Sequence, residues 1–212
     1  MLCALIAGAS SVAGAPLATA WDWRSVALDE GGPKANYLTK LLNQHVPHYC
    51  GSCWAHGSLS ALADRIKLGR KAEFPDVIPA IQVLLTCGSE IGSCFPNSSD
   101  KRWSDKVSNA SLGVYEWVAN NGVPDDTCLP YVAVSNPCTP VNICQNCESR
   151  NWPYTNESQS QCKAVADYPT IHVASYGAVK SEAAMMEEIQ QRGPISCVLE
   201  ADALGSYKQG IL

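Results

Sequence analysis

Apolar residues recur at three- and four-residue spacing in several parts of the chain, and this spacing predicts amphipathic helices. The clearest run begins at Cys53, and Gly69 is a typical residue at the end of a helix. The apolar face of this run is formed by Leu59, Leu62, Ala63 and Ile66. The pattern therefore predicts one long helix over residues 53–69.

Three further helices are expected near residues 78–85, 111–119 and 181–192. The apolar faces of the last two are formed by Val114, Trp117, Val118, Met185, Met186 and Ile189. Gly193-Pro194 ends the last helix, and residues 195–199 are predicted to form a strand.

The first 20 residues differ in composition from the rest. Residues 2–12 are apolar and residues 13–20 are rich in Ala, which resembles the apolar and cleavage regions of a secretory signal peptide. A disordered or mis-assigned N-terminus is the alternative, because no Lys or Arg precedes the apolar run. No segment approaches the roughly 20 apolar residues of a membrane helix. We expect a signal-like segment over residues 1–20 and one domain over residues 21–212.

The composition is typical of a globular protein, since 46% of the 212 residues are hydrophobic and 17% are charged. The net charge is −5 and no run of Lys or Arg exceeds two residues, so no nucleic-acid partner is expected. Eleven cysteines beside a leader-like segment favour disulfides in an oxidising compartment. Residues 121–165, rich in Pro, Asn, Ser and Cys, are expected to be a disulfide-stapled loop region. Three N-x-S/T sequons begin at Asn97, Asn109 and Asn156.

The strongest chemical signal is the run Cys50-Gly51-Ser52-Cys53-Trp54 at the start of the long predicted helix. The nucleophilic form of cysteine is the thiolate, and the positive end of a helix dipole beside Cys53 favours that anion. A zinc site is the alternative, with Cys50 and Cys53 as one half and Cys144-x-x-Cys147 as the other. The amphipathic helix directly after Cys53 and the secreted context argue against zinc.

The motif matches the active-site signature of papain-family cysteine peptidases. The resemblance covers most of residues 21–212, including Trp21-Asp22-Trp23-Arg24 and Gly193-Pro194-Ile195-Ser196-Cys197. It implies an α+β papain-like fold, in which a helical left domain carries Cys53 and a β-rich right domain is present only in part. It also implies that Gln44 helps to hold the oxyanion together with the Cys53 backbone N–H.

Two details resemble the cathepsin X group of this family, also called cathepsin Z. Gln44 lies nine residues before Cys53, three more than in most relatives, and the excess falls in residues 45–49. In that group a similar insertion carries a histidine that holds the C-terminal carboxylate of the substrate, and the resemblance assigns this role to His45. An imidazole protonated below its pKa of about 6.5 pairs well with a carboxylate in acid. His56 stands where many relatives have Phe and is expected to pack rather than to act as the base.

The resemblance also implies four disulfides and a free Cys53. The implied pairs are Cys50–Cys94, Cys87–Cys138, Cys128–Cys144 and Cys147–Cys162. Cys3 falls in the leader-like segment, and Cys197 is left over with an expected partner beyond Leu212.

The chain departs from the family pattern in three places. The family's catalytic histidine and asparagine follow the Gly-Pro strand and are expected beyond Leu212, whereas His172 precedes that strand and is not expected to be the base. Residues 95–108 resemble an insertion where the family has a Gly-Gly pair that lines the cleft. No pro-segment separates the leader-like residues from Trp21.

The resemblance therefore implies a cysteine-type peptidase, more specifically a carboxypeptidase that works through a Cys thiolate and an acyl-enzyme, without a cofactor or metal. Expected partners are peptides or proteins with a free C-terminus. We expect a monomer in the secretory pathway, either lysosomal or extracellular. The alternative is a truncated, catalytically inactive papain-fold protein with a binding role.

Overall fold

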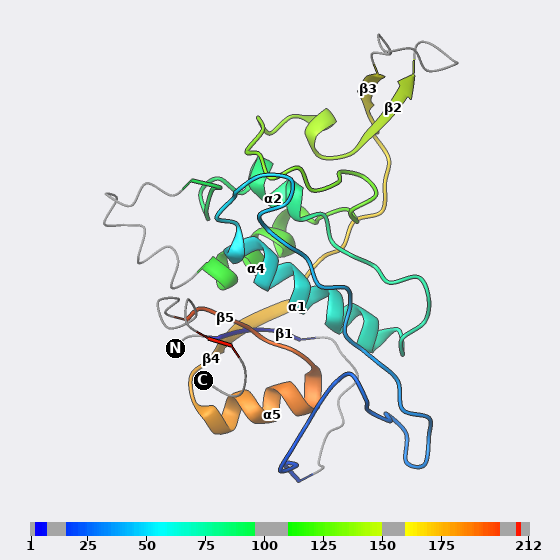
Figure 1. Cartoon of the computed structure of the whole chain (residues 1–212), viewed down its shortest axis with the longest axis vertical. Helices are drawn as coiled ribbons and strands as arrows, with labels where there is room; N and C mark the ends of the chain where they lie inside the picture. The colour runs from blue at the N-terminus through cyan, green and yellow to red at the C-terminus, as the bar shows by residue number, and fades with distance from the viewer. Residues whose placement is uncertain (1–2, 8–15, 96–109, 150–159, 200–206, 209–212) are drawn as a thin grey trace.

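The computed structural model describes residues 3–7, 16–95, 110–149, 160–199 and 207–208 (Figure 1). Within these ranges helices and antiparallel strands combine in an α+β arrangement, as expected. The helices are α1 (Cys53–Gly69), α2 (Ile81–Cys87), α4 (Ala110–Asn121), α5 (Glu182–Arg192) and the short 3-10 helix η1 (Pro140–Asn142). The strands are β1 (Cys3–Ala7), β2 (Gln145–Ser149), β3 (Ser160–Ala164), β4 (Ser175–Val179) and β5 (Ser196–Cys197).

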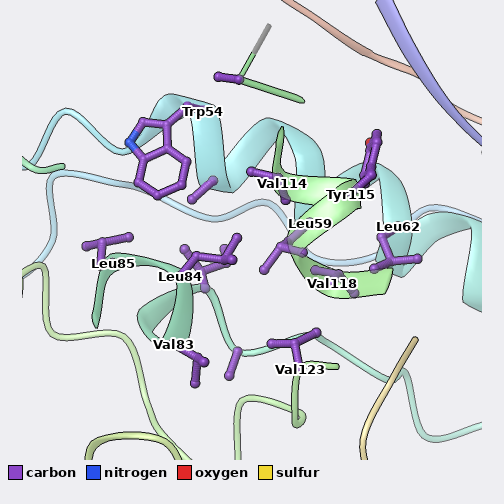
Figure 2. Packing of buried hydrophobic residues seen from close by; sticks show 14 of the residues in the cluster. Trp54, Leu59, Leu62, Val83, Leu84, Leu85, Val114, Tyr115, Val118 and Val123 are labelled. Carbon is purple, nitrogen blue, oxygen red and sulfur yellow. The ribbon is translucent and has the colours of Figure 1, made fainter. Parts of the chain in front are cut away.

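Helices α1, α2 and α4 pack around one hydrophobic core, which Figure 2 shows from close by. Leu59 and Leu62 lie on the predicted apolar face of α1 and are buried against Val114 and Val118 of α4 in this cluster. Burying an aliphatic side chain of this size contributes about 1.5–3 kcal/mol. The core therefore fixes α1, and with it the position of the candidate nucleophile at its first residue.

A second cluster of buried residues covers the far end of α1 and consists of Trp23, Val26, Tyr37 and Leu68. The indole N–H of Trp23 donates a hydrogen bond of 2.7 Å to the carbonyl oxygen of Ile189 on α5. The residues that follow the leader-like segment thus pack between α1 and α5.

Strands β4, β1 and β5 form an antiparallel sheet in that order, with β1 in the centre. Cys3 of β1 stands opposite Val179 of β4 and opposite Cys197 of β5. Figure 1 shows these strands between α1 and α5. Residues from the leader-like segment therefore supply the backbone partner of both β4 and β5.

Four disulfides hold the remaining loops, and they are the four pairs that the resemblance implied: Cys50–Cys94, Cys87–Cys138, Cys128–Cys144 and Cys147–Cys162. The last pair joins directly opposed residues of the β2–β3 hairpin. The region expected as a disulfide-stapled loop thus also contains regular structure.

One expectation was wrong, and a second holds only in part. Cys197 is disulfide-bonded, so it is not left over for a partner beyond Leu212. On α5, Met186 is 44% exposed while Glu188 and Gln190 are buried, because these two polar side chains have partners inside the fold. Ile189 of the predicted apolar face packs against the second buried cluster, so this face is buried only in part.

Smaller differences concern element boundaries. The helix expected near residues 78–85 begins at Ile81, and the strand expected over residues 195–199 is confined to Ser196–Cys197. No helix in the described ranges is long and apolar enough to cross a membrane. The sequon asparagines Asn97, Asn109 and Asn156 lie outside the described residues, as does the expected insertion apart from Phe95.

Candidate active site

The candidate nucleophile is the first residue of the 17-residue helix α1. Its thiol is reduced and exposed. Ser52 is the N-cap, and its carbonyl oxygen accepts the N–H groups of Ala55 and His56 at 3.0 Å each. The first turn contains no acidic side chain, so the positive end of the helix dipole faces the thiol without a competing carboxylate on this turn.

The path of the chain into α1 is fixed on both sides of Cys53. The Cys50–Cys94 disulfide holds the preceding residues, and the N–H of Gly51 donates to the carbonyl oxygen of Cys94 at 2.8 Å. Trp54 is buried directly over Gly92, where an added Cβ would lie 2.5 Å from the indole ring. Gly92 is therefore needed for this packing, although the sequence pattern did not single it out.

The residues before the motif bring the two other candidate site residues into contact. The side-chain nitrogen of Gln44 lies 3.4 Å from Nε2 of His45, and the side-chain oxygen of Gln44 is buried without a hydrogen-bond partner among the described residues. The His45 ring is exposed and stacks on Tyr49 with ring centroids 4.6 Å apart. Its Nδ1 accepts the N–H of Cys50 at 3.4 Å. The Gln44 amide and the His45 ring thus lie side by side, next to the Cys50–Cys94 disulfide that precedes Cys53.

Tyr131 joins this loop to the helix cap, and the sequence alone did not identify it. Its hydroxyl donates to the carbonyl oxygen of Gln44 at 2.7 Å and lies 2.8 Å from the buried Oγ of Ser52. Burial raises the pKa of Tyr131, so the hydroxyl keeps its proton at neutral and acidic pH. Tyr131 lies 87 residues after Gln44, so local patterning carries no sign of this contact.

The four histidines occupy different environments. His56 is half-buried, and desolvation lowers its pKa. The hydrogen bond to the Ser52 backbone opposes this shift, and the charge of His45 adds to it. His172 contacts Thr170 and the carbonyl oxygen of Ala119, while His48 is exposed. No imidazole in the described part of the chain hydrogen-bonds the Cys53 thiol. His56 packs edge-on against Tyr131 with ring centroids 4.8 Å apart, as its expected packing role requires.

The zinc alternative is contradicted by the disulfides. Cys50, Cys144 and Cys147 are each oxidised in a different pair, so three of the four proposed ligands carry no free thiolate. Cys53 alone of that set is free.

A cavity of about 310 Å³ is lined in part by residues of the loop before α1 and by His56 of α1. It is lined mainly by apolar residues, with the His56 and Tyr131 rings in its wall and Asp126 among its polar contributors. The His56 ring thus lines this cavity and also contacts Ser52, the N-cap of α1.

The candidate site thus combines a reduced cysteine at a helix start, a disulfide-bonded cysteine three residues before it and an upstream glutamine. Residues 17–212 match the family described as "Papain family cysteine protease", and the chain belongs to this family. It is similar to Cathepsin Z of Onchocerca volvulus, with 35% identity over 196 residues that cover 92% of this chain and 55% of that protein. It is also similar to Cathepsin B of Dictyostelium discoideum, with 25% identity over 84% of this chain and 51% of that protein.

The chain thus spans about half the length of these curated relatives. Among solved structures, a Carica candamarcensis cysteine protease in complex with E-64 matches with 26% identity and a TM-score of 0.34, over 48% of this chain and 39% of that one. Digestive procathepsin L 3 of Tenebrio molitor matches with 20% identity and a TM-score of 0.39, over 63% of this chain and 35% of that one.

Proposed function

We propose that this chain carries the nucleophile of a cysteine peptidase that trims the C-terminus of peptides, with Cys53 as the attacking group. The observation that carries the proposal is the reduced, exposed thiol at the first residue of α1. Membership of the papain family supports cysteine-type proteolysis. The specificity for C-termini rests on His45 and the longer loop before the nucleophile.

In the proposed reaction the Cys53 thiolate attacks the carbonyl carbon of the last peptide bond, and the C=O electron pair moves onto the oxygen. That oxyanion accepts hydrogen bonds from the Gln44 side-chain amide and from the Cys53 backbone N–H. As the first N–H of α1, the latter has no acceptor within its own helix. When the carbonyl re-forms, the C–N bond breaks and the released amino acid takes up a proton. Water then hydrolyses the thioester and restores the thiol.

Proton transfer in this scheme needs an imidazole beside the thiol. His45, His56 and His172 contact other groups and His48 is exposed, and no hydrogen bond in the described residues joins any of the four to Cys53. The proposal therefore assigns proton transfer to an imidazole other than the four histidines of this sequence.

His45 is proposed to hold the terminal carboxylate of the substrate. Its exposed ring is next to the side-chain amide of Gln44, the proposed oxyanion donor, and this neighbourhood supports the proposal. Stacking on Tyr49 supports the ring from one side. A charged hydrogen bond of this kind contributes about 1.5–3 kcal/mol, equivalent to roughly 10- to 150-fold in rate or affinity.

The proposed location is the secretory pathway, in a lysosomal or extracellular compartment. The four disulfides described above, together with the disulfide-bonded Cys197, support an oxidising environment. The leader-like composition of residues 1–20 supports the same location, although residues 3–7 also form β1. N-terminal sequencing of the mature protein separates removal of this segment, with a start near Trp21, from its retention.

The experiment uses the purified natural protein and a peptide pair that differs only in a free or amidated C-terminus. We expect residues to be released one at a time from the free acid, and the amide to react at least about 10-fold more slowly. Cys53→Ser is expected to abolish hydrolysis, and His45→Ala to remove most of the preference for the free acid. An unchanged preference in His45→Ala refutes the role of His45 alone. Absence of Cys53-dependent hydrolysis refutes the peptidase proposal and favours the binding alternative.

A further inference from the structure

The hydroxyl of Tyr131 lies between two segments that the proposed oxyanion site needs to hold together. It is 2.7 Å from the backbone carbonyl oxygen of Gln44 and 2.8 Å from Oγ of Ser52, the N-cap of α1. A carbonyl oxygen only accepts hydrogen bonds, and a tyrosine hydroxyl carries one hydrogen. Tyr131 therefore donates to Gln44, and the hydroxyl of Ser52 donates to the Tyr131 oxygen.

His56 completes this arrangement from the other side of the cap. Its Nδ1 lies 3.1 Å from both the carbonyl oxygen and Oγ of Ser52. Because the hydroxyl hydrogen of Ser52 is directed at Tyr131, both of these oxygens act as acceptors, and Nδ1 of His56 carries a hydrogen. Ser52 is fully buried, so every polar atom of its side chain is used within this group.

The side chain of Gln44 is held much less firmly than its backbone. Its nitrogen makes a long contact of 3.4 Å to His45, and its oxygen has no hydrogen-bond partner in the described ranges. The position of the amide therefore depends on the backbone of Gln44. The Tyr131 hydroxyl is what fixes that backbone carbonyl at 2.7 Å.

We infer that Tyr131 is a positioning residue that sets the distance between the Gln44 amide and the Cys53 backbone N–H. This inference rests on the proposed peptidase function and deepens it. The two oxyanion donors come from separate segments, the loop before the motif and the first residue of α1. Tyr131 binds the Gln44 carbonyl in the loop and Ser52 at the cap of α1, so it fixes the two segments that carry the donors relative to each other. Misplacing a catalytic group by about 1 Å costs on the order of 100-fold in rate.

Tyr131→Phe removes the hydroxyl and keeps the ring that packs against His56. We expect kcat for peptide hydrolysis to fall about 10- to 100-fold, since one oxyanion donor is no longer held in place. KM should change less than about 3-fold, because ground-state binding does not use the oxyanion donors. Alkylation of Cys53 by iodoacetamide forms no oxyanion, so its rate should also change less than about 3-fold.

Tyr115→Phe is the matched control. The Tyr115 hydroxyl on α4 is buried and donates to the carbonyl oxygen of Ser58 on α1 at 3.1 Å, and within the described residues it makes no hydrogen bond to Gln44 or Ser52. It should lower the melting temperature by a similar amount and leave kcat within about 2-fold. If both variants lose kcat in proportion to their loss of stability, Tyr131 has a structural role only and the inference is wrong.

The outcomes separate this inference from the function on which it rests. A wild-type protein without Cys53-dependent hydrolysis refutes the proposed function, and the role of Tyr131 falls with it. An active wild type with an unchanged kcat in Tyr131→Phe refutes the positioning role and leaves the proposed function intact.

Discussion

Arg65 carries a buried charge that is expected to be costly to remove from this fold. Its side chain is 4% exposed, and its guanidinium lies 3.0 Å from Oε1 of Glu188, which is 2% exposed. Arg65 also donates to the carbonyl oxygens of Pro194 and Gly193 at 2.7 and 3.0 Å. The residue thus ties α1 to α5 and to the turn that leads into β5.

The magnitude follows from what Arg65→Met leaves behind. Desolvation lowers the pKa of Arg65, and the charge of Glu188 opposes this shift. The attraction between the two charges therefore offsets part of the cost of burying them. Oε1 of Glu188 makes no directed hydrogen bond in the described residues, although its 3.0 Å contact with Arg65 is an ion pair; the charge interaction is therefore its main compensation. Removing one partner of a buried pair costs about 3–5 kcal/mol.

Arg192→Met is the matched comparison. Arg192 binds the other carboxylate oxygen of Glu188 from the surface and is 38% exposed. Solvent screens such a pair, so we expect a loss of about 1 kcal/mol. The double variant Arg65→Met with Glu188→Leu should recover most of the loss, because it leaves no buried charge unpaired.

Urea unfolding followed by circular dichroism at neutral pH measures these differences. A loss below about 1 kcal/mol for Arg65→Met, or a loss equal to that of Arg192→Met, refutes the reasoning from burial. If Arg65→Met does not fold, the double variant still decides the matter, since failure to restore folding contradicts the charge argument.

Two other predictions concern stability near the site. Burial lowers the pKa of His56, so the stability provided by the neutral ring is present above its unfolded pKa of about 6.5 and is lost as the pH falls toward the folded pKa. When the pH is lowered from about 7.5 to about 5, the free energy of unfolding should therefore fall less in His56→Phe than in the wild type. An equal fall in the two proteins, measured by urea unfolding at each pH, would contradict this. Gly92→Ala should destabilise by about 1–3 kcal/mol, because its Cβ would meet the Trp54 ring at 2.5 Å. The control Gly69→Ala, with no atom within 4 Å of its Cβ, should be neutral or slightly stabilising, and similar losses for both would refute the packing argument.

The sequence predicted what depends on local spacing and on a short motif. The bounds of α1 follow from apolar residues at helical spacing, from the small residues before Cys53 and from Gly69 at its end. Cys53, Gln44 and His45 could be proposed as site residues because they lie within one loop and one helix start. The four disulfide pairs came from the resemblance to the family rather than from periodicity.

Features that depend on long-range contacts were not predictable in this way. Glu188 and Gln190 are polar and lie on an amphipathic helix, yet they are buried because Arg65 and the residues near Ala18 satisfy them. Tyr131 looked like an ordinary loop residue and is separated from Ser52 by 79 positions. The leader-like composition of residues 3–7 likewise gave no indication of their pairing with β4 and β5.

The central claim is that Cys53 is an activated nucleophile, and its alkylation rate in acid tests this most directly. The purified protein and free cysteine are treated with iodoacetamide at about pH 5.5, where a thiol with the ordinary pKa of about 8.5 is almost fully protonated. Intact-mass analysis measures the single adduct, with Cys53→Ser as the blank. We predict labelling at Cys53 at least about 10-fold faster than that of free cysteine. Labelling at the rate of free cysteine or slower would contradict the claim that the start of α1 activates this thiol.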